Sequence, residues 1–442
     1  MEKNFKRTIM ASLIGSVLEW YDYNLYGLMS ALVFNKLFFS DIEGSVGVLL
    51  SLATFGIGFL VRPIGGIIFG SLGDRLGRSK VLIITILLMG TASTLIGLVP
   101  TYNTIGYWAP LILVFLRILQ GLGAGSEYAG AVIAIAENAP IKRRGFYASL
   151  PYVGVSIGIL LSSGIFGLMK MLPQSDFMAW GWRVPFVISI ILVIVGLVLR
   201  AKLQDSPVFE KAKQQQKRVK HPTITAIRTA PKGIILAWMT STAENSVGYF
   251  FQTFLVAYVV SNLHMSESLT LLSLTALGFV NIFSIPLMGL LSDKVGRRPV
   301  IMGGGIASAL FAFPLFWLLD TKSPILIVLS IVVGSCIFKG AITAAQAAWF
   351  TELYSTEIRY TAFAVGREFP TIIGGLTPTI ASGVLILSNG HTWVISLLIV
   401  IFSILPFIAA LIGPENSHLS LNEINNNQQK NQKNGSILKA SN

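Results

Sequence analysis

Several acidic and basic residues lie inside long apolar segments of this chain of 442 residues. A charged side chain at the centre of a lipid bilayer costs at least about 3 kcal/mol on insertion scales. Each such residue is therefore a candidate for proton transfer, ion pairing or ligand binding. The candidates are Glu19, Asp22, Arg62, Arg117, Glu127, Glu137, Glu244, Lys339, Arg367 and Glu368.

Two of the acids suit proton transfer. Glu19 and Asp22 are three residues apart, so they share one face of a helix. Asp22 is expected about 21 Å from the cytoplasmic side, and Arg117 about 18 Å from the same side. We predict that Asp22, or Glu19, pairs with Arg117 as a proton switch, because a carboxylate stays ionised beside an arginine and takes up a proton when the pair separates. The alternative is a permanent ion pair that braces two helices.

Two cations of the second half suit a solute carboxylate. Lys339 and Arg367 are both expected near mid-depth in their segments. The alternative is that Arg367 pairs with Glu244, or Lys339 with Glu368, without touching a ligand. Aromatic side chains nearby can cover an apolar ring or a quaternary ammonium. The predicted solute site consists of Trp20, Tyr23, Glu244, Lys339, Arg367 and Glu368.

A glycine-rich motif occurs twice. The sequence RPIGGIIFGSLGDRLGR, from Arg62 to Arg78, returns as GLLSDKVGRRP from Gly289 to Pro299. Tight glycine turns can hold the acidic residue near the N-terminus of a neighbouring helix and near the arginine that follows. The predicted cytoplasmic gate consists of Arg62, Asp74, Arg75, Arg78, Asp293, Arg297 and Arg298. The alternative is two short loops whose charges only set the topology.

A second repeat supports an internal duplication. Glu137 stands seven residues before Arg144, and Glu352 stands seven before Arg359. Two halves with the same polar residues between apolar segments are typical of transporters built from structural repeats.

The elements that position these residues are expected to be membrane-spanning helices. The chain is 53% hydrophobic and only 12% charged, with a mean hydropathy of +0.70. A span needs about 20 apolar residues. Twelve segments qualify, namely 8–33, 46–73, 80–100, 108–138, 146–170, 181–201, 232–261, 268–292, 299–319, 323–352, 358–388 and 391–413. We predict an all-α membrane protein with two six-helix bundles.

The basic residues predict the topology. The net charge is +13, and with a cytoplasmic N-terminus 25 of the 33 lysines and arginines fall in cytoplasmic segments. The positive-inside rule accounts for this bias, so both termini are expected in the cytoplasm. The predicted parts are a first bundle (1–201), a cytoplasmic linker (202–231), a second bundle (232–413) and a disordered tail (414–442).

Other classes of function lack their motifs. No glycine-rich loop ending in GK[ST] occurs, so ATP binding is not expected. The string GVSIG at Gly154–Gly158 fits a hydrolase motif but lies within an apolar helix, where a contact between helices explains it better. The single cysteine, Cys336, allows no thiolate metal cluster. We expect no catalytic residues, no cofactor and no nucleic-acid partner.

The motifs resemble those of a known transporter family. Arg62 to Arg78 resembles the loop between the second and third helices of the major facilitator superfamily. Four further strings are similar to the metabolite:proton symporter family: EWYDYNLYG (19–27), RILQGLGAGSEYAGA (117–131), GWRVPF (181–186) and DSPVFE (205–210). Tyr128 stands where that family usually has tryptophan, and Arg367 and Glu368 also depart from its pattern.

The resemblance implies a twelve-helix carrier of the inner membrane, expected to be a monomer, which imports a small carboxylate or zwitterion with a proton. Proline or glycine betaine is the first expectation for the solute. A dicarboxylate such as α-ketoglutarate, or proton-driven export by the same fold, is the alternative. A channel is disfavoured because the sequence shows no rings of like side chains at one depth.

Overall fold

The computed structural model describes residues 2–40, 44–201 and 222–426. Over these ranges the chain is helical and contains no β-strand. The predicted linker falls mostly outside the described residues, and so does the tail from residue 427. The remaining part of the linker forms a short helix, α12 (Pro222–Thr229).

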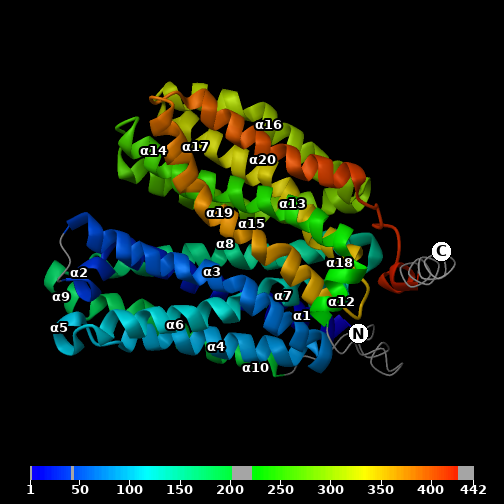
Figure 1. The fold of residues 1–442 in the computed structure, drawn as a ribbon, viewed down its shortest axis with the longest axis horizontal. Helices are drawn as coiled ribbons and strands as arrows, with labels where there is room; N and C mark the ends of the chain where they lie inside the picture. The colour runs from blue at the N-terminus through cyan, green and yellow to red at the C-terminus, as the bar shows by residue number, and fades with distance from the viewer. Residues whose placement is uncertain (1, 41–43, 202–221, 427–442) are drawn as a thin grey trace. The chain divides into compact units, whose positions relative to one another are not determined.

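The first half contains six long helical segments (Figure 1). They are α1 (Glu2–Leu32), α3 (Gly44–Leu76), α4 (Arg78–Leu98), α6 (Trp108–Ala124) continued by α7 (Glu127–Ala136), α8 (Arg144–Met169) and α10 (Val184–Arg200). Short helices lie between them: α2 (Phe34–Phe38), α5 (Tyr102–Ile105), η1 (Ile141–Arg143), α9 (Gln174–Ala179) and η2 (Gly181–Arg183).

The second half repeats this pattern with two irregularities. Its segments are α13 (Pro231–Tyr249) continued by η3 (Phe250–Phe254) and α14 (Leu255–Ser261), α15 (Glu267–Val295), α16 (Arg297–Asp320), α17 (Pro324–Val332) continued by η4 (Val333–Lys339) and α18 (Gly340–Leu353), α19 (Arg359–Leu387) and α20 (Thr392–Ile412). The stretches η3 and η4 are π-helical. Such wider turns are often found at functional sites, and η4 ends at Lys339.

Ten of the described helices are long and apolar enough to cross a membrane. The two other predicted spans correspond to α1 and to α13 with its continuation. Charged residues interrupt α1, and the sequence TSTAENS lowers the hydropathy of α13. The prediction of an all-helical membrane protein is confirmed.

The chain forms two compact units. Unit 1 consists of Met1–Ala131 and Gly154–Gln204, and unit 2 of Val132–Val153 and Asp205–Asn442. The end of α7 and the start of α8 are therefore grouped with the second half, which they contact through the ion pairs and hydrogen bonds of residues 137–146 that are described below. The predicted division into bundles at residues 1–201 and 232–413 stays a prediction.

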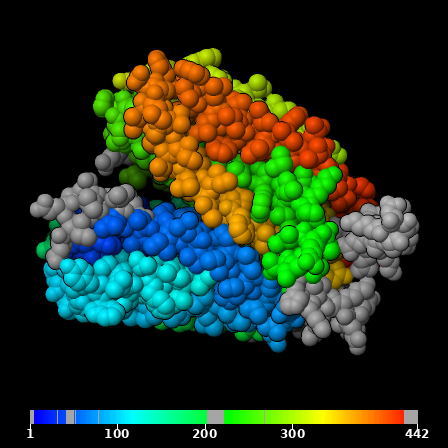
Figure 2. Space-filling view, in the orientation of Figure 1, coloured from blue at the N-terminus to red at the C-terminus, as the bar shows by residue number. Residues whose placement is uncertain are grey.

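Aromatic packing and apolar surfaces characterise both units. In unit 1, Phe34 stacks on Phe186 at 6.0 Å and meets Trp182 edge-on. Unit 2 contains a comparable buried core around Phe250, which stacks on Phe254 at 5.1 Å. Large apolar side chains are exposed on α6 and α20, whose surfaces are visible in Figure 2 as cyan and red-orange atoms. Exposed apolar faces of this kind are expected where helices contact lipid.

Candidate functional site

In unit 1 the Glu19 carboxylate pairs with Arg62. Their Oε1 and Nη2 atoms are 2.9 Å apart, and both side chains are buried. The Arg62 guanidinium also lies 5.2 Å from the centroid of the Tyr23 ring. Arg62 was predicted as part of the gate, but in the structure it is the ion-pair partner of a predicted proton-coupling residue.

The second predicted acid, Asp22, has a different environment. Its Oδ1 accepts a hydrogen bond from the Ser189 hydroxyl of α10 at 2.7 Å. Its Oδ2 has no hydrogen-bond partner among the described residues, although the side chain is only 1% exposed. The hydroxyl of Ser93 on α4 also lies beside this carboxylate. Asp22 is thus a buried acid surrounded by hydroxyl groups.

The predicted direct pair between Asp22 and Arg117 is absent from the part of the chain that the structure describes. Arg117 donates instead to Gln120 Oε1 at 2.5 Å. Its guanidinium lies 4.2 Å and 4.3 Å from the ring centroids of Tyr23 and Tyr26. Because these groups surround the guanidinium, Asp22 does not contact it directly.

Another buried ion pair joins α10 to α7. Arg200, at the end of α10, forms an ion pair with Glu127 through both of its terminal nitrogens. The Thr85 hydroxyl donates to Glu127 Oε2 at 2.9 Å. The positive-inside rule counts Arg200 among the 25 basic residues of the cytoplasmic segments, because an arginine at the end of an apolar segment gives no sign that it turns inward.

Unit 2 brings together the predicted solute-binding charges. Glu244 on α13 lies 3.5 Å from Lys339 Nζ and 3.8 Å from Arg367 Nη2. Arg367 also contacts Glu368, at 3.3 Å. Lys339 therefore pairs with Glu244 rather than with Glu368, and both cations have an acidic partner. The alternative pair of Arg367 and Glu244 is present.

A neutral side chain completes this cluster. The Tyr152 hydroxyl on α8 accepts a hydrogen bond from Lys339 Nζ at 2.5 Å. Gln346 lies seven residues after Lys339, on the same face of its helix, and its Oε1 has no hydrogen-bond partner among the described residues. Buried acceptors without partners are costly unless another molecule satisfies them. Tyr152 and Gln346 do not stand out in the sequence, because neutral polar residues are common in apolar helices.

The predicted aromatic contacts belong to unit 1. Tyr23 is buried, and its ring is occupied by Arg117 and by Arg62. Trp20 is half-buried. Solute binding by these two residues stays a prediction.

The second copy of the glycine-rich motif forms a charge cluster in unit 2. Asp293 accepts hydrogen bonds from the backbone N–H groups of Gly145 and Phe146, at 2.7 and 2.9 Å, at the N-terminus of α8. Arg297 pairs with Asp293 at 2.7 Å and with Glu352 at 3.2 Å. This is the arrangement predicted for the motif, in which a carboxylate meets a helix N-terminus and an arginine.

The acids and arginines of the second repeat form ion pairs between its two copies. Arg144 pairs with Glu352 at 2.9 Å, and Arg359 pairs with Glu137 at 2.5 Å. Each arginine thus pairs with the acid of the other copy. These four residues stand out in the sequence as a repeat.

The other predicted gate residues differ from one another. Arg298 donates to the carbonyl oxygens of Ala410 and Leu411 at the end of α20. Asp74 is buried and Arg75 is exposed. The side chain of Arg78 lies outside the described residues.

The beginning of the tail packs against the same cluster. Glu415 accepts hydrogen bonds from the backbone N–H groups of Arg297 and Arg298 at the N-terminus of α16, and the Leu419 carbonyl accepts one from Arg144. Leu421 and Ile424 are 4% and 2% exposed. Residues 414–426 therefore differ from the expected disordered tail, because a capping carboxylate and two apolar side chains attach them to unit 2.

Residues 421–426 are helical and begin with a capping box. The Ser420 N–H donates to Glu423 Oε2 at 2.7 Å, and the Glu423 N–H donates to the Ser420 hydroxyl at 3.2 Å. Hydrogen bonds from Ser420 lower the pKa of the exposed Glu423. The contact is therefore complete above the ordinary pKa of a glutamate and is lost as the pH falls through the lowered value.

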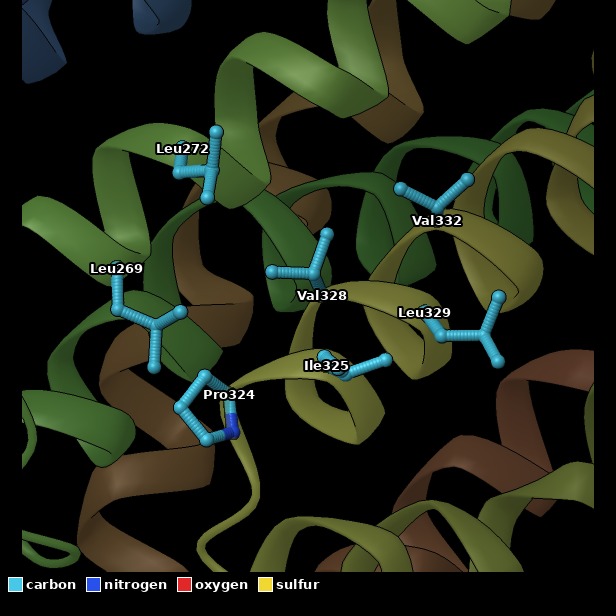
Figure 3. Close-up of a pocket in the computed structure, with 7 residues that line it drawn as sticks. All are labelled: Leu269, Leu272, Pro324, Ile325, Val328, Leu329 and Val332. Carbon is cyan, nitrogen blue, oxygen red and sulfur yellow. The ribbon is translucent and has the colours of Figure 1, made fainter.

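The apolar groove of Figure 3 contains none of these charges. It lies between α15 and α17, and its lining residues are Leu269, Leu272, Pro324, Ile325, Val328, Leu329 and Val332. A purely apolar lining does not suit a charged solute.

Helices long and apolar enough to span a membrane, with clusters of buried charge, are typical of an integral membrane transporter. The profile of the family described as "Sugar (and other) transporter" matches residues 8–223, and that of the Major Facilitator Superfamily matches residues 238–439. The chain is 37% identical over 399 residues to the shikimate transporter of Escherichia coli K12, covering 89% of this chain and 91% of that protein.

A second relative is the proline/betaine transporter of the same strain, 35% identical over 390 residues, covering 85% of this chain and 77% of that protein. The chain belongs to the major facilitator superfamily, in the metabolite:proton symporter family, as its motifs predicted. It is a transporter and not an enzyme.

Solved structures show the same fold. The proton:xylose symporter XylE bound to 6-bromo-6-deoxy-D-glucose superposes with a TM-score of 0.78 at 19% identity, covering 96% of this chain and 98% of that one. A partially occluded inward-open structure of XylE from E. coli gives 0.69 at 19% identity, covering 93% and 98%. At this identity the likeness concerns the fold alone.

Proposed function

We propose that the chain is a proton-coupled symporter that imports a small carboxylate or zwitterion across the inner membrane by alternating access. Both termini face the cytoplasm. Glu19, Asp22 and Arg117 couple the proton, and the charge cluster around Glu244 binds the solute. The motif residues around Asp293 close the cytoplasmic side.

The observation that carries the proposal is the difference between the buried acids of unit 1. Glu19 and Glu127 each have an arginine partner, at 2.9 Å in the first case and through two nitrogens in the second. Asp22 has a hydroxyl donor and an oxygen without a hydrogen bond. A buried carboxylate without a cation in contact is the group that gains most from proton uptake.

The charges of unit 2 support the solute class. Lys339 and Arg367 lie around Glu244, and Glu368 contacts Arg367, so the cluster has two charges of each sign. A zwitterion matches both signs, with its carboxylate near the cations and its ammonium near the acids. A proline or betaine type of solute therefore remains the first candidate, as for the proline/betaine transporter relative.

A hydroxylated monocarboxylate is the second candidate, because the chain is 37% identical to a shikimate transporter. Buried polar groups such as Gln346 and Asn281, whose amide oxygens have no hydrogen-bond partner among the described residues, would suit its hydroxyl groups. A dicarboxylate such as α-ketoglutarate fits less well, since Glu244 and Glu368 offset the two cations.

The test is uptake into proteoliposomes with an imposed pH gradient, acid outside. Labelled proline, glycine betaine, shikimate and α-ketoglutarate are compared, each with and without a protonophore. Accumulation of one solute that collapses with the protonophore supports the proposal and identifies the solute class. Release of preloaded solute against its gradient, when the acid side is the receiving side, identifies an exporter instead. Equal fluxes with and without the gradient contradict proton coupling.

A further inference from the structure

We propose that Asn24 on α1 and Ser163 on α8 form a subsite of unit 1 that binds a hydroxyl group of the solute. The inference rests on the proposed transport function and deepens it, because it selects a hydroxylated carboxylate among the candidate solutes. Both residues belong to unit 1, so the subsite lies within one compact part of the chain.

Close packing of α1 against α8 brings the polar side chains together. A Cβ atom on Gly158 would lie 2.5 Å from the Val17 carbonyl oxygen, so no larger residue fits there unless the backbone moves. This is the contact between helices that the string GVSIG predicts. One turn further along α8, the hydroxyls of Ser162 and Ser163 reach the side chain of Asn24.

Asn24 donates to both serines. Its Nδ2 lies 2.8 Å from Ser162 Oγ and 3.0 Å from Ser163 Oγ. The Ser162 hydroxyl has a single proton, which it donates to the carbonyl of Gly158 at 2.9 Å or of Ile159 at 3.0 Å. Ser162 can therefore only accept from Asn24. This fixes the Asn24 amide with its nitrogen towards the serines and its oxygen away from them.

The pair keeps one donor and one acceptor for another molecule. Ser163 accepts from Asn24, and its own proton has no acceptor among the residues that the structure describes. Within the same residues, Asn24 Oδ1 receives no hydrogen bond. Ser163 is exposed and Asn24 is half-buried, so a small molecule can reach both groups.

The depth of the pair argues that it faces a path for solute rather than lipid. Counted from the cytoplasmic ends of their spans, Asn24 and Ser163 are both expected at about 25 Å, within an apolar core about 30 Å thick. Hydrogen-bonding groups without partners are costly against lipid, and they are tolerated at such depths where they line a water-filled cavity.

A hydroxyl group matches the pair. It accepts from Ser163 and donates to Asn24 Oδ1 at the same time. A carboxylate only accepts and an ammonium only donates, so each would leave one group of the pair without a partner. Proline, glycine betaine and α-ketoglutarate carry no hydroxyl group, whereas shikimate does. The subsite adds a criterion that the charges of unit 2 do not supply, and it favours the second candidate of the previous section.

Trp20 extends the same surface of α1. Trp20 and Asn24 are four residues apart and lie on one face of the helix, and both are half-buried. An aromatic ring beside a few polar groups is the usual lining of a small-molecule site. The predicted contact of Trp20 with the solute therefore fits a ring-shaped solute whose hydroxyl group lies at Asn24.

The test measures binding to the full chain in detergent by equilibrium dialysis, so that the result does not depend on a proton gradient. The labelled probes form two pairs that differ in hydroxylation. Shikimate is compared with cyclohexenecarboxylate, which has its ring and carboxylate without the hydroxyl groups, and hydroxyproline is compared with proline. Proton-driven accumulation of the same acids is measured separately in proteoliposomes.

Three variants and one control are compared with the unmodified chain. Ser163→Ala removes the donor, Asn24→Leu removes the acceptor, and Ser163→Thr keeps the hydroxyl. The control is Thr94→Ala in the same unit, since among the contacts described its hydroxyl bonds to the Gly90 carbonyl of its own helix.

The unmodified chain and the control are expected to bind the hydroxylated member of at least one pair about fivefold more tightly, which corresponds to one net hydrogen bond. Ser163→Ala and Asn24→Leu are each expected to abolish this preference, while the affinity for the other member stays within about twofold. Ser163→Thr is expected to keep it.

An unmodified chain that shows no such preference in either pair, or that binds none of the four acids, would overturn the subsite and leave proton symport open to its own test. A preference that persists in both Ser163→Ala and Asn24→Leu would overturn it too. Equal losses for both members of a pair would assign the effect to helix packing, with the same consequence. Absence of proton-driven accumulation in a chain that keeps the preference would overturn the symport and not the subsite.

Discussion

Asp22 and Glu127 are both buried acids, but their substitution is expected to have different effects. Asp22→Asn removes a group that can bind a proton and leaves no arginine without its partner. Under a gradient of one pH unit, accumulation is expected to fall from about tenfold to about unity, with counterflow preserved. Both are measured in proteoliposomes.

Glu127→Gln is the contrasting variant. It leaves Arg200 buried without its carboxylate, and breaking a buried ion pair costs about 3–5 kcal/mol. A lowered melting temperature in detergent is expected, in contrast to Asp22→Asn. If Asp22→Asn still accumulates solute against its gradient, Asp22 has no part in coupling.

Lys339 and Tyr152 are expected to contribute unequally to solute binding. Lys339→Gln removes a cation from the proposed solute site and is expected to raise the apparent KM at least about tenfold, which corresponds to about 1.4 kcal/mol. Tyr152→Phe removes one hydrogen bond to Lys339, and its effect is expected to be smaller, about 1 kcal/mol. Initial rates of labelled solute uptake measure both, and an unchanged KM in Lys339→Gln would exclude the lysine from the site.

The candidate site was predictable in its charges but only partly in its contacts. Glu19 and Asp22 share a helix face, yet only Glu19 contacts an arginine. Burial of a charge is visible in the sequence because the neighbouring residues are apolar. The partner of each charge depends on how neighbouring helices are rotated and shifted against one another. That arrangement cannot be read from a single sequence. The contacts of Ser93 and Gln120 were not predicted, because hydroxyl and amide groups cost little free energy within an apolar helix and do not stand out as charges do.

At the scale of elements, Asp293 is expected to stabilise the N-terminus of α8. Asp293→Asn keeps the size of the side chain but removes the charge that faces two backbone N–H groups and Arg297. A carboxylate at a helix N-terminus contributes up to about 2 kcal/mol when partly buried. The melting temperature is therefore expected to fall by a few degrees. Asp320→Asn, at an exposed position, is the matched control, and equal melting temperatures would contradict the capping role.

The start of the tail gives a second prediction for an element. A chain that ends after residue 413 loses the Glu415 cap and the buried side chains of Leu421 and Ile424. A chain that ends after residue 426 keeps them. The shorter chain is expected to melt several degrees lower and the longer one to match the full chain, as measured by thermal unfolding in detergent. Equal stability of the two would show that these contacts do not hold the helices of unit 2.

At the scale of the whole molecule, apolar segments and the repeated motif were sufficient to predict the fold class. Hydropathy located α1 and α13 as well, although Asp22 and the TSTAENS sequence make them too polar for a strict criterion of membrane spans. The boundary between the compact units was not predictable, because it depends on contacts such as Arg144 with Glu352, which join residues 208 positions apart. Only the helices themselves are defined by local sequence.

The topology of the whole chain can be tested with a single thiol. Cys336 is buried, so the original chain is expected to react as little with a membrane-impermeant maleimide as a Cys336→Ser background does. Lys170 and Arg228 are both exposed, and the positive-inside rule places Lys170 outside and Arg228 in the cytoplasm. In that background Lys170→Cys should be labelled in intact cells, and Arg228→Cys only after permeabilisation. Labelling of Arg228→Cys in intact cells would show the opposite orientation, and the proposed proton uptake by Asp22 would then occur from the other side of the membrane.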